Sequence, residues 1–124
     1  MSFTPRAITL REIRMPLIEP FRISSGVVSA RRILLVEIAT AEGPTGWGEC
    51  VAGEEPYYSA ETIDTARWAV ENWLAPRLLG RAITSATEVG VILAQGIVGH
   101  PMAKASLEMA CWDLEAQTRS QPLA

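Results

Sequence analysis

The pattern of apolar and polar residues divides the chain into an extended first half and a helical second half. Residues 7–17 and 32–40 are rich in Ile, Leu and Val, as β-strands are, and residues 45–51 have the pattern of a short returning strand. Glu42, Gly43 and Pro44 form a turn signal between the last two segments. We therefore expect a three-stranded antiparallel meander over residues 7–51.

The first strand is less regular than the others. Its apolar positions move from even to odd numbers after Leu10, which predicts either a bulge or a strand that shares two environments. Pro16 and Pro20 lack the N–H that a strand ladder needs. We therefore expect pairing to be limited there, and residues 21–30 to form a loop.

Residues 59–119 carry apolar positions at helical spacing. Ser59 is a candidate N-cap for a first helix, in whose first turns Glu61 and Asp64 would lie, and Pro76 is expected to end or kink that helix before Gly80 closes it. The expected buried stripe of this helix consists of Ile63, Ala66, Val70, Trp73 and Leu74.

Two more helices follow. Residues 85–88 fit a capping box at the start of the second, which Gly96 and Gly99 end, and Pro101 suits the first turn of the third. Strands followed by helices predict an α+β fold in which a three-helix bundle packs on one face of the sheet.

Composition places the chain among globular proteins of one domain. It has 124 residues, 48% of them hydrophobic, and a net charge of −3 with no run of Lys or Arg, which argues against nucleic acid or an anionic membrane as partner. It has no apolar run long enough to span a bilayer. Its first residues also lack the uninterrupted apolar core of a signal peptide. We expect a cytoplasmic protein in which Cys50 and Cys111 remain reduced thiols.

Residues 46–62, GWGECVAGEEPYYSAET, hold the most concentrated candidate chemistry. Carboxylates such as Glu49, Glu54 and Glu55 serve as acids, bases or metal ligands. We favour the alternative that Glu54 and Glu55 are solvated loop charges. For Glu49 we favour a structural role, in which it is half-buried and paired with a backbone group or an arginine.

The other reactive residues also have structural interpretations. His100 is the only histidine, so it forms no metal cluster alone, and its place beside Gly99 and Pro101 favours capping or packing. Cys50 has no base placed beside it by the sequence, so a core thiol is favoured over a nucleophile. A small hydrolase built on Glu49, Glu54 or His100 is therefore our least favoured interpretation.

Several short motifs in order resemble a known family. The chain is similar to the N-terminal capping domain of the enolase superfamily, in the muconate-lactonizing subgroup, and most like o-succinylbenzoate synthase and N-acylamino acid racemase. The resemblance runs over residues 8–123. The motifs that carry it are EPFR at 19–22, SSG at 24–26, GWGEC at 46–50, YYS at 57–59, GHPMAK at 99–104 and ACWDL at 110–114.

This resemblance implies a two-part enzyme in which residues 1–124 form one capping domain over a C-terminal TIM-type barrel. Family barrels hold Mg²⁺ and two lysines that abstract a proton α to a carboxylate, giving an enediolate. The barrel is absent from these 124 residues, so the resemblance assigns no catalytic residue and no metal ligand to this chain. It implies that the chain alone is inactive, with the barrel and a small carboxylate substrate as its partners.

The resemblance also implies two substrate-specificity loops. Where relatives typically read Thr-Ser-Phe-Gly, this chain reads Ile-Ser-Ser-Gly at 23–26, which leaves the substrate open. Where a glycine commonly ends the last helix, Ser120 stands, so that cap is expected to differ. The implied loop residues are Phe21, Ile23, Ser24, Ser25 and Gly26 in the first loop, and Val51, Ala52, Tyr57 and Tyr58 in the second.

An alternative of another class remains open, namely a stand-alone α+β binding or interaction module without catalysis. A detached cap would expose the apolar surface that meets the barrel, and would self-associate through it.

Overall fold

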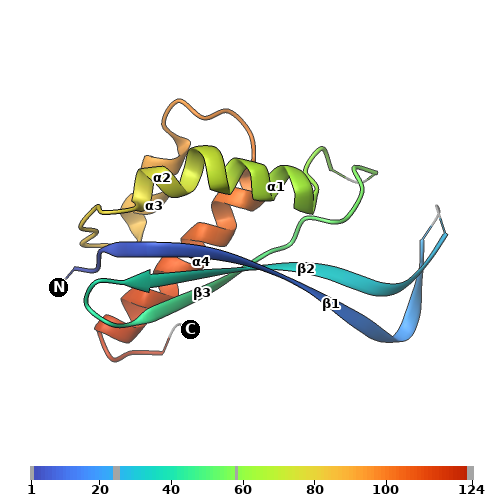
Figure 1. Ribbon diagram of the computed structural model, residues 1–124, viewed down its shortest axis with the longest axis horizontal. Coiled ribbons are helices and arrows are strands. Elements are labelled where there is room, and N and C mark those ends of the chain that lie inside the picture. Colours follow the sequence, from blue (N-terminus) through green and yellow to red (C-terminus); the bar gives the residue numbers. More distant parts are fainter. Residues whose placement is uncertain (1, 24–25, 58, 123–124) are drawn as a thin grey trace.

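The computed structural model describes residues 2–23, 26–57 and 59–122, and for residues 15–31 it describes the backbone alone. Three antiparallel strands, β1 (Pro5–Ile23), β2 (Gly26–Thr40) and β3 (Thr45–Cys50), form one sheet in the order β1-β2-β3. The helical half follows and packs on one face of this sheet (Figure 1). The expected α+β meander is thus confirmed.

The prediction of a loop over residues 21–30 was wrong. The pairing of β1 with β2 is irregular between Pro16 and Phe21, but it resumes at Phe21–Val28 and continues to Ile23–Gly26. Both prolines lie at or next to the irregular stretch, where their missing N–H groups break few ladder hydrogen bonds. The ladder therefore continues beyond them.

The shift of apolar positions in β1 reflects two environments rather than a bulge. Register is continuous from Ala7 to Pro16. Ile8 and Leu10 pack against the core, whereas Ile13 points to the opposite face and is 39% exposed. Alternation along an unbroken strand therefore explains the pattern.

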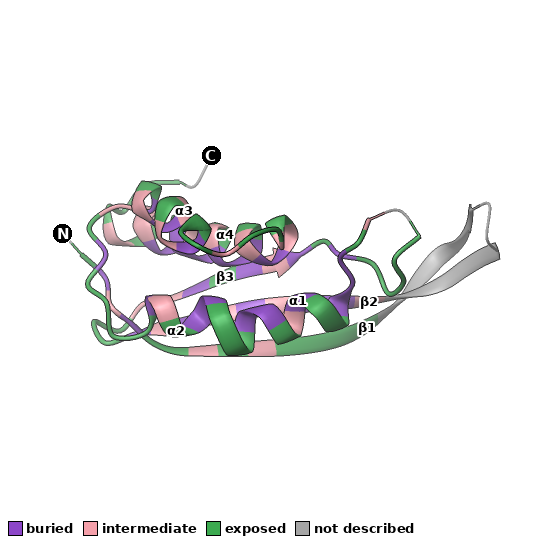
Figure 2. Ribbon diagram, turned by 90° about the horizontal axis from the view of Figure 1, so that it is seen from above, coloured by how far each residue is buried: buried purple, intermediate pink, exposed green. Residues whose placement is uncertain are grey.

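Five helical elements make up three helical segments. The first segment runs without a break through α1 (Ile63–Ala69), the π-helix η1 (Val70–Leu74) and α2 (Ala75–Leu78). The others are α3 (Thr87–Ala94) and α4 (Pro101–Thr118). Buried residues lie where these helices and the sheet face each other (Figure 2). The largest fully buried side chains include Leu34, Ile38, Ile63, Leu74, Leu78, Leu107 and Leu114.

The first helix begins later than the sequence suggested. Thr62, not Ser59, is its N-cap: the Thr62 hydroxyl accepts a hydrogen bond from the Thr65 N–H at 3.2 Å, and the Thr65 hydroxyl accepts one from the Thr62 N–H at 2.8 Å. Two threonines thus form the reciprocal capping box that Ser or Thr forms elsewhere with Glu or Gln.

The expected burial of Trp73 was also wrong. Between Val70 and Leu74 the backbone widens to a π turn, in which the Ala75 N–H bonds to the Val70 carbonyl. The wider turn keeps Val70 and Leu74 inside and leaves Trp73 55% exposed. The helical path does not end at Pro76; it continues to Leu78, and Gly80 closes it with a φ of 78°.

The second helix is capped by a different residue from the one expected. The Ser85 hydroxyl accepts from the Thr87 N–H at 3.3 Å, but the Glu88 carboxylate bonds to the Thr84 hydroxyl and not to the cap backbone. Glu115 of α4 instead accepts from the Ala86 N–H at 3.0 Å. A distant residue therefore satisfies part of this helix start.

The last helix ends with a serine in the place of a glycine. Ser120 adopts a left-handed φ of 53°, its N–H bonds to the Gln117 carbonyl at 3.1 Å, and the Gln121 N–H bonds to the Ala116 carbonyl at 2.9 Å. This pair of bonds is a Schellman motif, which normally has Gly at the left-handed position. Among the described residues, no helix is both long and apolar enough to cross a membrane.

Candidate functional site

The β1–β2 hairpin extends well beyond the third strand. β3 pairs with β2 as far as Leu34–Cys50, whereas the β1–β2 ladder continues to Ile23–Gly26. Residues 13–23 and 26–33 thus form a two-stranded arm, called the arm below, that projects past the helices (Figure 1). Phe21, Ile23 and Gly26 lie at its far end, and Ser24 and Ser25 fall outside the described residues.

The second expected specificity segment leaves β3 at the same end of the molecule (Figure 1). The two ends of this segment are held together by a hydrogen bond from the Ile63 N–H to the Gly53 carbonyl at 2.8 Å and by a parallel bridge between Gly53 and Thr62. We call residues 53–62 the neck loop. Two segments far apart in sequence therefore lie at one end of the fold.

The named residues around the neck loop differ in accessibility. Tyr57 is 73% exposed and Val51 is also exposed, whereas Ala52 is only 2% exposed and belongs to the core. A hydrogen bond between Tyr57 and Glu55 raises the pKa of the phenol. Tyr58 lies outside the described residues. Val51 and Tyr57 are thus the accessible members of this set, while Ala52 anchors the chain beneath them.

The three glutamates of residues 46–62 that we singled out do not converge. Glu54 and Glu55 are exposed on the neck loop, as expected for solvated charges. Glu49 is half-buried as expected, but no partner of its carboxylate occurs among the described side chains; its backbone N–H lies 3.4 Å from the Met109 sulfur. Within the described part of the chain, no three Asp, Glu, His or Cys residues gather as metal ligands would.

A fourth glutamate, Glu61, has a structural role that the sequence did not reveal. The residue is 7% exposed, and its carboxylate accepts hydrogen bonds from the Met102 N–H at 2.8 Å and the Ala103 N–H at 3.1 Å. Glu61 was expected in the first turn of its own helix, but it caps the N-terminus of α4 instead. Spacing along the chain carries no signal for this contact, because the partners are 41 and 42 residues away.

His100 occupies the N-cap position of α4 in a left-handed conformation, with a φ of 55°. Its ring packs at a tilt against Trp68, with 6.2 Å between the ring centroids. The buried Nδ1 atom has no hydrogen-bond partner among the described residues. These contacts agree with the packing role expected for this residue.

Both cysteines are buried and free. Burial raises the pKa of the Cys50 thiol and raises that of Cys111 to about 12. Thiols in this state are poor nucleophiles at neutral pH, since the thiolate is the reactive form. The expectation of core thiols is confirmed.

The glycines of GWGEC permit close contact between β3 and α4. A Cβ atom on Gly48 would lie 2.1 Å from the Ser106 carbonyl oxygen, and one on Gly46 would lie 2.4 Å from that of Ala110. Such distances exclude any side chain, so the helix backbone rests directly on the strand. This part of the motif is therefore required for packing.

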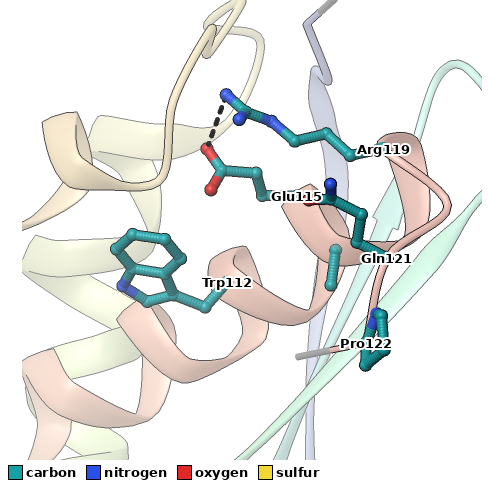
Figure 3. A pocket seen from close by; sticks show the side chains of 6 residues that line it. Trp112, Glu115, Arg119, Gln121 and Pro122 are labelled. Carbon is teal, nitrogen blue, oxygen red and sulfur yellow. Dashed lines mark ion pairs between the residues drawn. The ribbon is translucent and has the colours of Figure 1, made fainter. Parts of the chain in front are cut away.

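A shallow depression lies at the opposite end of α4 from the neck loop. In it, Glu115 and Arg119 point toward each other and form an ion pair at 3.8 Å (Figure 3). Because Glu115 also caps α3, its carboxylate is already engaged. The depression is lined by Trp112, Glu115, Ala116, Arg119, Gln121 and Pro122.

Comparison with curated proteins finds relatives that are much longer than this chain. An N-succinylamino acid racemase from Amycolatopsis sp is 41% identical over 117 residues, which are 94% of this chain and 31% of that protein. An o-succinylbenzoate synthase from Bacillus subtilis is 38% identical over the same shares of both chains. The chain thus spans about a third of the length of the curated relatives it matches.

Solved structures of enolase-superfamily proteins have the same fold over nearly the whole of this chain. An enolase-superfamily member from Enterococcus faecalis superposes with a TM-score of 0.89 at 36% identity, over 99% of this chain and 33% of that one. The L-Ala-D/L-Glu epimerase from Bacillus subtilis gives 0.82 at 28% identity, over 94% and 32%. The model of the mandelate racemase / muconate lactonizing enzyme N-terminal domain matches residues 6–124. The chain belongs to this family of N-terminal domains in the enolase superfamily.

Proposed function

We propose that this chain is the substrate-specificity cap of an enolase-superfamily enzyme of the o-succinylbenzoate synthase or N-acylamino acid racemase type. The observation that carries the proposal is the placement of two segments, the far end of the arm and the neck loop, at one end of a domain of this family. Relatives that carry the same domain in a chain about three times as long are named N-succinylamino acid racemase and o-succinylbenzoate synthase.

In this proposal the chemistry belongs to a barrel domain that follows the cap. The described residues of this chain do not fit a Mg²⁺ site, because they bring no three suitable ligands together. We therefore assign the metal, which would stabilise the enediolate formed by loss of the α-proton, to the barrel. The cap contributes contacts to the part of the substrate away from the carboxylate, and alone it is inactive.

The test uses the complete polypeptide that carries this domain. Exchange of the α-proton of N-succinylamino acids with D₂O is measured by NMR in the presence of Mg²⁺, for the complete polypeptide and for residues 1–124. We expect exchange with the first and none with the second. Exchange by residues 1–124 alone would contradict the proposal. Absence of exchange by the complete polypeptide would exclude the racemase type, and absence of both exchange and dehydration of an o-succinylbenzoate precursor would contradict the proposal and favour the stand-alone binding module.

Substitutions then test the specificity role. Phe21→Ala and Tyr57→Ala are expected to change the ratio of kcat/KM between N-succinyl and N-acetyl substrates by about tenfold, the usual effect of one apolar contact. Val98→Ala is the matched control, because Val98 is 91% exposed on the connection between α3 and α4. An unchanged ratio in both loop variants would count against the cap as the source of specificity.

A further inference from the structure

The arm needs an anchor that the sheet does not supply. Beyond the Leu34–Cys50 pair it has only two strands, and two-stranded ribbons are marginally stable in water. Its direction relative to the helices must therefore be set by contacts where it leaves the sheet.

A cluster of four charged side chains lies at this point. Glu12 of β1 and Arg32 of β2 form an ion pair on the face of the sheet that carries the helices. Arg32 also reaches Asp64 of α1 at 3.1 Å, and Arg67 of α1 reaches Glu12 at 3.5 Å. Two acids and two bases thus join β1 and β2, at the point where the arm begins, to the first helix.

The electrostatics of the cluster favour the charged forms of its members. The hydrogen bond from Arg32 lowers the pKa of Glu12, and the hydrogen bonds to Glu12 and Asp64 raise the pKa of Arg32. Arg14, directly opposite Arg32 across the strands, is exposed to solvent and adds a like charge. Arg32 therefore depends on its two carboxylate partners for compensation.

The first residues of α1 also contact the neck loop. Asp64 follows Ile63, whose N–H bonds to the Gly53 carbonyl at 2.8 Å and closes that loop. A continuous path therefore runs from the arm through Arg32 and Asp64 to the neck of the second segment.

We propose that Arg32 and Asp64 are positioning residues that couple the arm to the neck loop, so that the two segments keep a fixed separation. The role in substrate selection rests on the function proposed above. Neither residue touches the substrate in this scheme; each acts through the segment that it holds.

Hydrogen exchange in the complete polypeptide, measured without substrate, tests the coupling. Arg32→Gln and Asp64→Asn are each expected to speed exchange both in the arm and at the Ile63 amide, by about two- to fivefold, as the strength of a partly exposed ion pair allows. The double variant should add little to Arg32→Gln, because that substitution already breaks the contact that Asp64→Asn removes. High salt should reduce the difference between wild type and variants.

Glu37→Gln is the matched control, since it breaks the 2.9 Å Arg11–Glu37 pair on the other face of the same sheet without touching α1. It should leave the Ile63 amide unchanged. Arg32→Lys, which keeps one charge but not the forked geometry, should fall between wild type and Arg32→Gln.

Two results would overturn the coupling: no change at the Ile63 amide in either single variant, or a double variant whose effect is the sum of the two single effects. Altered exchange with unchanged substrate selectivity in the complete enzyme would overturn only the role in substrate selection. The exchange measurement needs no substrate, so the coupling is judged separately from the proposed function.

Discussion

The Asp113 carboxylate on α4 accepts a hydrogen bond from the backbone N–H of Trp47 at 2.9 Å. Trp47 lies in β3, an edge strand whose outer N–H and C=O groups have no strand partner among the described residues. Exposed edges of this kind invite pairing with other chains. The helix therefore supplies the partner that a fourth strand would otherwise provide.

The contact is repeated along the strand. Met109 meets the Glu49 N–H at 3.4 Å, and Gln117 donates to the Thr45 carbonyl at 2.8 Å. Four helical residues rise about 6 Å, and two strand residues rise about 6.6 Å. Every fourth side chain of α4 therefore lies opposite every second residue of β3.

We expect Asp113→Ala to lower the free energy of unfolding by about 1 kcal/mol, the usual worth of one hydrogen bond at a partly exposed site. Urea denaturation monitored by circular dichroism measures the loss. Asp113→Asn keeps an acceptor oxygen and should retain most of the stability. Equal losses in both variants would show that the charge, and not the hydrogen bond, is what matters.

Gly48→Ala should be strongly destabilising, by about 3 kcal/mol, because the new Cβ would lie 2.1 Å from the Ser106 carbonyl oxygen, and two backbones would have to separate. Gly53→Ala is the control, since the nearest atom to its Cβ would be 3.9 Å away. The midpoints of thermal unfolding compare the two variants. A tolerated Gly48→Ala would contradict the close packing of β3 on α4.

Ser120→Gly should stabilise the domain by about 0.5–1 kcal/mol. Ser120 has a φ of 53°, a left-handed conformation that costs a side chain about 1 kcal/mol or more and glycine very little, although glycine also adds freedom to the unfolded chain. Chemical denaturation checks the gain. Ala105→Gly, at an exposed position inside α4, is the comparison and should lose about 1 kcal/mol. A loss of similar size in Ser120→Gly would show that the left-handed cap carries no strain.

Alkaline pH should destabilise the domain through its thiols. Burial raises the pKa of Cys111 from 9.0 to about 12, so the unfolded chain releases this proton at lower pH than the folded one. The contribution to stability is complete below about pH 9 and is lost as the pH rises toward 12. Cys111→Ala should flatten this part of the stability–pH curve, whatever its effect at neutral pH, and a thiol reagent at about pH 8 should react only after unfolding.

The meander and the position of the last helix followed from local signals. The turn at Glu42–Pro44 lies between two apolar strands, and Pro101 starts α4 where expected. The errors arose where a neighbour outweighed a local preference. Trp73 sits at α-helical spacing, yet a π turn excludes it from the core; the prolines of β1 weaken its ladder, yet the partner strand continues beyond them.

For the candidate site, too, some residues could be identified from the sequence and others only from the structure. The residues of the two segments, from Phe21 to Gly26 and from Val51 to Tyr58, were identified from motif resemblance, and their contact with substrate remains a prediction. Nothing in the sequence indicated that Glu61 caps α4, or that Arg32 meets Asp64, because those partners are far apart along the chain.

By itself the sequence determined the order of strands and helices, since hydrophobic periodicity and turn residues act over a few neighbouring positions. Its short motifs, by their resemblance to known proteins, also indicated the family. The tertiary structure alone decided how far the arm extends, which residues cap which helix, and why GWGEC needs its glycines. These features depend on the approach of segments distant in sequence, where one backbone contact or one ion pair selects among locally similar alternatives.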